Sequence, residues 1–230
     1  MTAGQYRFDA LVVDEGQDLA AEWWQVLRTL LVENADVLWL EDDEQDLFGQ
    51  PSVALDGFVS YESRDNWRTP QSVARLIEQW FPGRAVYRNP LPGLPCEVIQ
   101  CQEEQEQPAR LEECIRSMVQ QGFEAEDIAV LTVRSMRDSF LHSVESIAGL
   151  PVRRFSGDYD DKGRQVLSDG KLLVESIYRF KGNQAPAVVL VDCSSRCTTS
   201  TDDVHAFYCG LTRCALSLQI LWQGSGRWSS

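Results

Sequence analysis

FDALVVDE, at residues 8–15, is the stretch that decides the fold of this chain, because its apolar run ends in two acids. Such a run, without polar alternation, is typical of a strand buried in a parallel sheet, and ligands bind such sheets at the carboxyl ends of the strands. The stretch DVLWLEDDEQ (36–45) repeats the pattern. Two strands are therefore expected to deliver carboxylates, Asp14 and Glu15 among them, to one edge of a sheet.

A helix is expected between these two strands. Asp18 is its predicted N-cap, and residues 49–66, rich in Gly, Pro and Ser, are predicted to be irregular. RTPQSVARLIEQWF (68–81) is a second predicted helix, with Pro70 in its first turn. The apolar face of the first helix is predicted to consist of Trp23, Trp24, Leu27, Leu30 and Leu31.

Strands and helices alternate beyond NPLPGLP (89–95), which marks a boundary. Helices are expected over about 107–121, 136–148 and 202–214. This alternation indicates a doubly wound α/β unit with a mostly parallel sheet. The expected strands are CEVIQC, IAVLTV, LPVRRF, KLLVESI, APAVVLVD and SLQILW.

The composition limits where a nucleic acid can bind. The 230 residues carry a formal net charge of −14, from 35 acidic and 21 basic residues. Phosphate binding depends on Lys and Arg, so any contact with a nucleic-acid strand must be local. The chain has neither an apolar run of about 18 residues nor a signal peptide, so a cytoplasmic location without membrane contact is expected.

The seven cysteines are scattered, and a chain of this size can fold without disulfide bonds, so reduced thiols are expected. Cys193, Cys197 and His205 leave a zinc site as an alternative, although their spacing is loose.

Candidate chemistry begins at DEGQD (14–18). A strand-end Asp followed by Glu suits metal-assisted phosphoryl transfer, because one carboxylate holds Mg²⁺ and the second orients the attacking water. Acids at strand ends are also common helix caps, so the pair alone leaves both interpretations open.

As a unit, DEGQD resembles the DExQD motif of the UvrD/Rep-like superfamily 1A helicases. Four later stretches resemble further motifs of this family, in the family's order and along nearly the whole chain. LEDDEQDLFG (40–49) is similar to GDxxQxIY, NWRT (66–69) to NYRS, SIYRFKGNQAPAVVLVD (176–192) to T-x-H-x-x-KG-x-E with its strand, and YCGLTRCA (208–215) to Y-x-x-x-TRA.

The resemblance implies a RecA-like fold of the P-loop NTPase type, with doubly wound parallel sheets. Residues 1–62 would form the C-terminal part of a first RecA-like domain. Residues 63–95 would connect it, through the motif IV helix, to a second RecA-like domain at 96–230.

The resemblance also implies roles in binding and hydrolysing ATP with Mg²⁺. Glu15 would be catalytic, Gln45 would sense the γ-phosphate, and Arg68 and Arg213 would be arginine fingers. Without the motif set, both arginines are equally well explained as helix ion-pair partners. Asp14 would hold the metal, Asp14, Gln17, Gly182 and Gln184 would contact the nucleotide, and Phe48, Ser176 and Lys181 would contact the strand.

The departures from the family pattern matter as much as the matches for the expected function. Glu41 replaces a glycine, Tyr178 a histidine and Gln184 a glutamate, and no G-x-x-x-x-G-K-[ST] loop occurs. We therefore expect the C-terminal portion of an ATP-dependent DNA helicase or translocase that lacks ATPase activity by itself. Its expected partners are single-stranded or partly duplex DNA and a missing N-terminal helicase segment. The alternatives are a non-catalytic module that binds nucleic acid or protein, and a degenerate remnant.

Overall fold

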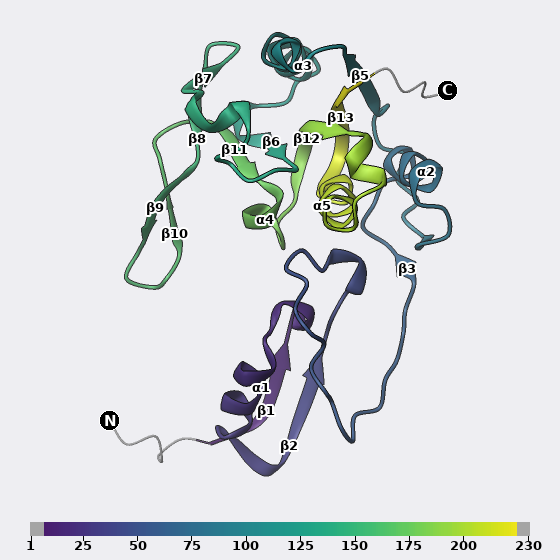
Figure 1. The fold of residues 1–230 in the computed structure, drawn as a ribbon, viewed down its shortest axis with the longest axis vertical. Helices are drawn as coiled ribbons and strands as arrows, with labels where there is room; N and C mark the ends of the chain where they lie inside the picture. Colours follow the sequence, from purple (N-terminus) through teal and green to yellow (C-terminus); the bar gives the residue numbers. More distant parts are fainter. Residues whose placement is uncertain (1–6, 225–230) are drawn as a thin grey trace. The chain divides into compact units, whose positions relative to one another are not determined.

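The computed structural model describes residues 7–224 of the chain (Figure 1). The chain divides into two compact units, which we call unit 1 (Met1–Glu62) and unit 2 (Ser63–Ser230). In residues 7–224, no helix combines the length and the apolar character needed to cross a bilayer.

Unit 1 is built on a parallel pair of strands, β1 (Phe8–Val13) and β2 (Leu31–Trp39), joined by helix α1 (Ala21–Arg28). A short 3₁₀ helix follows each strand, at Gly16–Asp18 and Asp43–Gln45. The two predicted parallel strands are confirmed, and the carboxyl ends of both lie at the same edge. The predicted burial is wrong, because Val13 is the one buried residue of β1 and β2 has none.

The start of the first helix differs from the prediction. Asp18 lies in the 3₁₀ helix, and α1 begins three residues later with Ala20 as N-cap and no side-chain hydrogen bond to its first turn. Only one of the two neighbouring tryptophans is buried, since Trp24 is 5% exposed and Trp23 is 64% exposed. The predicted apolar face is wrong at three positions, because Trp23 is exposed, α1 ends at Arg28 before Leu30, and Leu31 begins β2.

The two faces of the unit 1 sheet differ. On the face of Val13 and Trp39, the ring of Trp24 from α1 meets Trp39 edge-on at 5.3 Å between centroids. Paired residues in a parallel sheet point to the same side, so Val12 and Leu38 lie on the other face, where they are 64% and 53% exposed. One face of this small sheet is therefore covered and the other is apolar and exposed.

Unit 2 begins with a short parallel pair, β3 (Asp65–Asn66) and β4 (Val86–Tyr87), joined by α2 (Gln71–Trp80). A seven-stranded sheet follows, in which every neighbouring pair is parallel except the edge pair formed by the last two strands. In spatial order its strands are β5 (Glu97–Cys101), β13 (Cys214–Gln223), β12 (Ala185–Ser194), β6 (Ile128–Thr132), β11 (Leu172–Ser176), β8 (Leu150–Arg153) and β7 (Ser146–Ile147).

Helices cover both faces of this sheet (Figure 1). Helix α3 (Gln107–Gln120) contacts β12 and β13, and its buried residues share one core with Ile128 and Val130 of β6. On the opposite face lie α4 (Ile177–Phe180) and α5 (Thr201–Leu211), where Gly210 comes close to Leu190 of β12. The predicted α/β class with a mostly parallel sheet is therefore confirmed.

Two segments between the predicted strands differ from expectation. The helix predicted over 136–148 is wrong, since the chain forms a 3₁₀ helix at Phe140–Ser143 and then β7. The reason is Ser139, whose hydroxyl donates to the buried carboxylate of Asp192 at 2.6 Å and also accepts from the Leu141 amide. A side chain that bonds nearby backbone favours caps and turns over a continuing helix.

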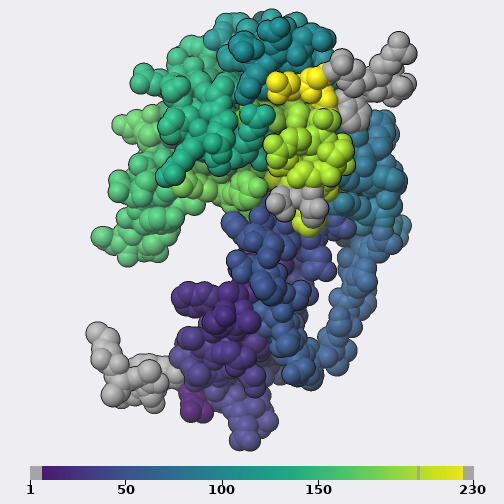
Figure 2. Space-filling view, viewed as in Figure 1, coloured from purple at the N-terminus to yellow at the C-terminus, as the bar shows by residue number. Residues whose placement is uncertain are grey.

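The second difference is an antiparallel hairpin that the sequence does not predict. It consists of β9 (Phe155–Tyr159) and β10 (Gln165–Leu167), and it turns at Gly163, whose φ is 75°. Figure 2 shows this hairpin, in green, projecting from the rest of unit 2. Its residues lie just before β11 and flank the pocket discussed below.

Candidate functional site

The candidate residues of unit 1 lie in the two loops that follow β1 and β2. Backbone hydrogen bonds tie these loops together, because the Leu40 amide donates to the Val13 carbonyl at 2.9 Å and the Gly16 amide donates to the Leu40 carbonyl at 2.8 Å. The first residues of DEGQD and of LEDDEQ are therefore held at one edge of the sheet.

A chain of side-chain hydrogen bonds then links the two predicted motifs. The Gln17 amide group donates to Oε2 of Glu15 at 2.8 Å, and its oxygen accepts from the Asp42 backbone amide at 3.1 Å. The Gln45 amide group donates to Oδ2 of Asp42 at 2.6 Å. Gln17 is buried, so this bridge fixes Glu15 and Gln45 relative to each other. Asp42 is not among the site residues predicted from sequence, although its place after the second strand is a usable signal.

The backbone at the acidic pair is unusual. Glu15 has a φ of 55°, in the left-handed region that a non-glycine residue adopts at a cost of about 1 kcal/mol or more. The next residue must be Gly16, because a Cβ there would lie 2.2 Å from Nε1 of Trp39. That same nitrogen donates to Oε2 of Glu41 at 2.9 Å, which gives the departure at Glu41 a structural role.

The charge at this edge is strongly negative. Residues 14–18 and 41–46 hold eight carboxylates and neither Lys nor Arg.

Within residues 7–224, however, no cluster of three or more His, Cys, Asp or Glu side chains has the geometry to hold a metal ion. This finding gives no support to zinc at Cys193, Cys197 and His205. Mg²⁺ needs fewer protein ligands, since it is commonly held by one or two carboxylates together with waters and substrate phosphates. Asp14, which is exposed, can serve in that way.

Arg68 lies in unit 2, in the turn before α2. Oδ1 of Asn66 accepts from the backbone amides of Arg68 and Thr69 at 3.0 and 2.9 Å, and the Asn89 amide group donates to the Arg68 carbonyl at 2.9 Å. The Arg68 side chain is exposed and forms no ion pair with another residue of the described part of the chain. Its backbone is thus fixed while its guanidinium group is available for a ligand.

Arg213 has a different environment, because it is only 1% exposed. Its Nε donates to the Cys209 carbonyl at 3.0 Å, one terminal nitrogen lies 3.4 Å from the Asn183 carbonyl, and the other donates to Oγ1 of Thr212 at 3.1 Å. Protein oxygens therefore occupy donors on each guanidinium nitrogen, and the side chain is held in one position.

Two predicted motifs of unit 2 meet at the amino ends of β12 and β13. Besides the contact of Arg213 with Asn183, the Ala185 amide donates to the Arg213 carbonyl at 3.0 Å. The side-chain amide of Gln184 lies 3.5 Å from the Thr212 carbonyl. The structure therefore brings Gln184 and Arg213 together.

The residues predicted to contact a nucleic-acid strand differ in exposure. Ser176, at the end of β11, is 5% exposed, so its hydroxyl is not presented at the surface. Gly182 is exposed and has a φ of 81°, which turns the chain after Lys181. In unit 1, Phe48 is 51% exposed. Lys181, Gly182 and Phe48 can reach a ligand in this conformation, whereas Ser176 cannot without local movement.

No protein-family model matches the chain, and no curated protein matches it either.

Proposed function

We propose that this chain is the C-terminal portion of an ATP-dependent DNA helicase or translocase with RecA-like units, which couples ATP hydrolysis to movement on single-stranded DNA. The observation that carries the proposal is the hydrogen-bonded series Glu15, Gln17, Asp42 and Gln45. It fixes a candidate water-activating carboxylate relative to a candidate phosphate sensor, as phosphoryl transfer requires. In this proposal Asp14 would hold the Mg²⁺ that accompanies the nucleotide.

The proposal also gives two arginines of unit 2 a role in neutralising negative charge. Phosphoryl transfer spreads negative charge over the equatorial oxygens, and a well-placed arginine can raise the rate by about 10³-fold or more. Arg68 has an exposed side chain on a fixed backbone, and Arg213 is fixed beside Gln184. We assign both arginines to charge stabilisation and Gln184 to a contact with the nucleotide.

The phosphate-binding loop would come from another polypeptide segment. Among the described residues, β1 pairs with no strand but β2, and Val12 and Leu38 leave one sheet face apolar and exposed. Parallel sheets are normally covered on both faces, and a two-stranded sheet is marginally stable. We infer that a segment with a strand, a G-x-x-x-x-G-K-[ST] loop and a helix completes this unit.

ATP hydrolysis tests this proposal. The chain alone is expected to show no ATPase activity, whereas the chain joined to such a segment should hydrolyse ATP faster when single-stranded DNA is added. Glu15→Gln is expected to lower that rate by about 10²-fold or more, because it removes a general base. Lys162→Ala, on the exposed hairpin, is the control and should leave the rate unchanged. A completed protein that stays inert with DNA present would contradict the assignment.

Strand binding tests the second half of the proposal with the chain alone. Single-stranded DNA should bind at low salt, with an affinity that falls as salt is raised. Lys181→Ala should weaken binding to all sequences and reduce the slope of log affinity against log salt by about 1, because it removes one phosphate contact. Lys162→Ala again serves as the control, and fluorescence anisotropy measures both. Absence of binding in low salt would rule out the nucleic-acid function.

A non-catalytic module that binds nucleic acid or protein is the second candidate. The burial of Arg213 favours it, because donors on every guanidinium nitrogen are satisfied by protein oxygens in this conformation. This candidate predicts strand binding that Arg213→Ala leaves intact and no ATP hydrolysis by the completed protein.

A further inference from the structure

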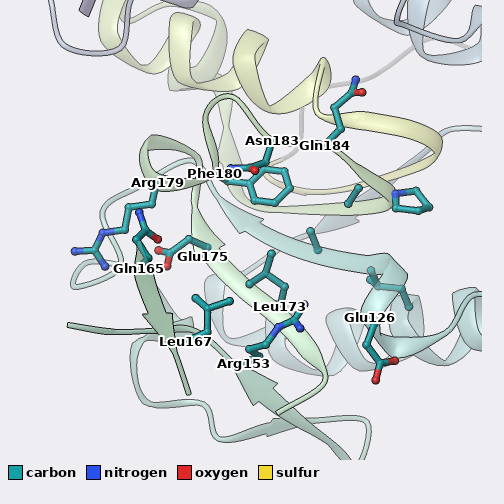
Figure 3. A pocket seen from close by; sticks show the side chains of 14 residues that line it. Glu126, Arg153, Gln165, Leu167, Leu173, Glu175, Arg179, Phe180, Asn183 and Gln184 are labelled. Atoms are coloured by element: carbon teal, nitrogen blue, oxygen red, sulfur yellow. The ribbon is translucent and has the colours of Figure 1, made fainter. Parts of the chain in front are cut away.

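Unit 2 contains a pocket of about 370 Å³ beside α4 (Figure 3). Pockets that bind small ligands range from about 300 to 1,000 Å³, so this one suits a ligand of modest size. Its lining comes from the start of β6 and β12, from β8, β10, β11 and α4, and from Glu126, whose carboxylate pairs with Lys171 at 3.6 Å. Of the site residues discussed above, it includes Gln184.

Glu175 of β11 places a buried carboxylate in this pocket. The side chain is 5% exposed, and the one hydrogen bond that it accepts from the described residues comes from the Ser176 amide, at 2.8 Å to Oε1. A buried carboxylate is stable only when it is paired or well hydrogen-bonded. Glu175 therefore has capacity for donors from a ligand.

Two arginines of the pocket lack acidic partners. Nε of Arg153 is buried without a hydrogen bond, and neither Arg153 nor Arg179 forms an ion pair within residues 7–224. The Arg179 guanidinium instead lies 4.4 Å from the ring centroid of Phe155 in the hairpin. Other arginines of unit 2 do find carboxylates, as in the pairs Arg88–Asp65, Arg110–Glu113, Arg116–Glu112, Arg134–Glu104, Arg164–Asp160 and Arg196–Asp203.

The lining requires a ligand with three parts. A carboxylate only accepts hydrogen bonds and a guanidinium only donates them, so the ligand must offer donors to Glu175 and acceptors to Arg153. Leu167 and Leu173 form an apolar wall between Glu175 and Arg153, whereas Arg179 lies on the other side of Glu175 (Figure 3). A flat body with a donor edge and an anionic group fits all three requirements.

We propose that this pocket binds one nucleoside monophosphate group whose base carries an exocyclic amine. The amine donates to Glu175, the base lies against Leu167 and Leu173, and the phosphate contacts Arg153. Carboxylates recognise cytosine through its N4 amine, whereas uracil and thymine offer carbonyl oxygens beside a single N–H. Such a group occurs both in a free nucleotide and in a single strand, and its place in a strand rests on the function proposed above.

The first measurement is calorimetric titration of the chain with CMP and with UMP. CMP is expected to bind at least about fivefold more tightly, which is the lower range for a good base contact. Glu175→Gln, which keeps an acceptor for the Ser176 amide, should remove this preference. Arg153→Gln should weaken CMP and UMP binding alike, because it removes the phosphate contact. Arg110→Gln is the matched control, because Arg110 is exposed on α3, at the other face of the sheet, and it should change nothing.

The second measurement separates the two sources of the group. Deoxycytidine oligomers should bind more tightly than deoxythymidine oligomers, and Glu175→Gln should abolish the difference. If oligomers bind without base preference and Arg153→Gln has no effect on CMP binding, the pocket inference is wrong while DNA binding stands. If CMP binds with the expected preference and no oligomer binds, the pocket takes a free nucleotide and the proposed strand function fails. Equal affinity for CMP and UMP in the unmodified chain overturns the inference.

Discussion

Unit 1 and unit 2 use the same building pattern, parallel strands joined by helices, but they differ in how far it is completed. In unit 2, strands β6 and β12 have neighbours on both sides and helices on both faces, and Val130 and Leu190 are fully buried. In unit 1 the sheet has two strands, and Val12 and Leu38 are exposed on one face. The comparison teaches that unit 2 has its own core, while unit 1 carries a well-ordered polar site on a scaffold that leaves apolar surface uncovered.

The largest expected effect on stability comes from comparing one substitution, leucine to alanine, in the core of unit 2 and on the exposed face of unit 1. Leu190→Ala in β12 should lower the free energy of unfolding of unit 2 by about 2–5 kcal/mol, because it leaves a cavity in a closed core. Leu38→Ala in β2 should change unit 1 by no more than about 0.5 kcal/mol, as expected for an exposed position. Urea unfolding followed through amide signals of each unit gives both values. A large loss for Leu38→Ala would show that its face is covered in solution.

A smaller effect is expected at the polar site of unit 1. Gln17→Ala leaves the Asp42 amide without its side-chain acceptor and removes a donor to Glu15, which should cost about 1–3 kcal/mol. Hydrogen exchange at the Asp42 amide should accelerate accordingly. Gln25→Ala, on the exposed side of α1, is the control. Unchanged exchange at Asp42 would mean that the Gln17 bridge does not hold the two loops.

The stabilities of the two units should also respond differently to alkaline pH. Burial, reinforced by nearby charges or thiols, raises the pKa of the Cys114 and Cys214 thiols from 9.0 to about 12. The folded state therefore keeps protons that the unfolded state has lost, so the stability of unit 2 falls as the pH rises from about 9 to about 12. Residues 1–62 contain no cysteine, so unit 1 lacks this contribution.

The measurement is the urea midpoint of each unit across this pH range. A variant with Cys114→Ala and Cys214→Ala should show a shallower decline for unit 2. An equal decline in the variant and the unmodified chain would assign the effect to other groups.

Much of the fold follows from patterns in the sequence. Apolar runs such as 128–131 and 187–191 predict strands because burial on both faces demands continuous apolar residues. The meeting of DEGQD with LEDDEQ at one edge follows from the same reasoning, because parallel strands place their carboxyl ends together. The sequence therefore predicts the α/β class and the spatial grouping of Glu15, Gln17 and Gln45.

What the sequence did not predict depends on contacts between distant residues. The segment 136–148 has enough apolar residues for a helix, but Ser139 bonds to Asp192, which lies 53 residues away. The 155–167 hairpin contains too few apolar residues to indicate strands. The pocket could not be predicted either, because Arg153 and Glu175 come to line one pocket only through the register of β8 and β11.

The position of β13 has a consequence for how the chain is made. Strand β13 lies between β5 and β12, and Gln219 bonds to Glu97, which was synthesised 122 residues earlier. During synthesis on the ribosome, the edge of β5 that pairs with β13 therefore stays unpaired until β13 has emerged. Closing contacts of such long range is slow, and unpaired strand edges are prone to aggregate. Chaperone demand during translation should therefore concentrate on the interval between the emergence of these two strands.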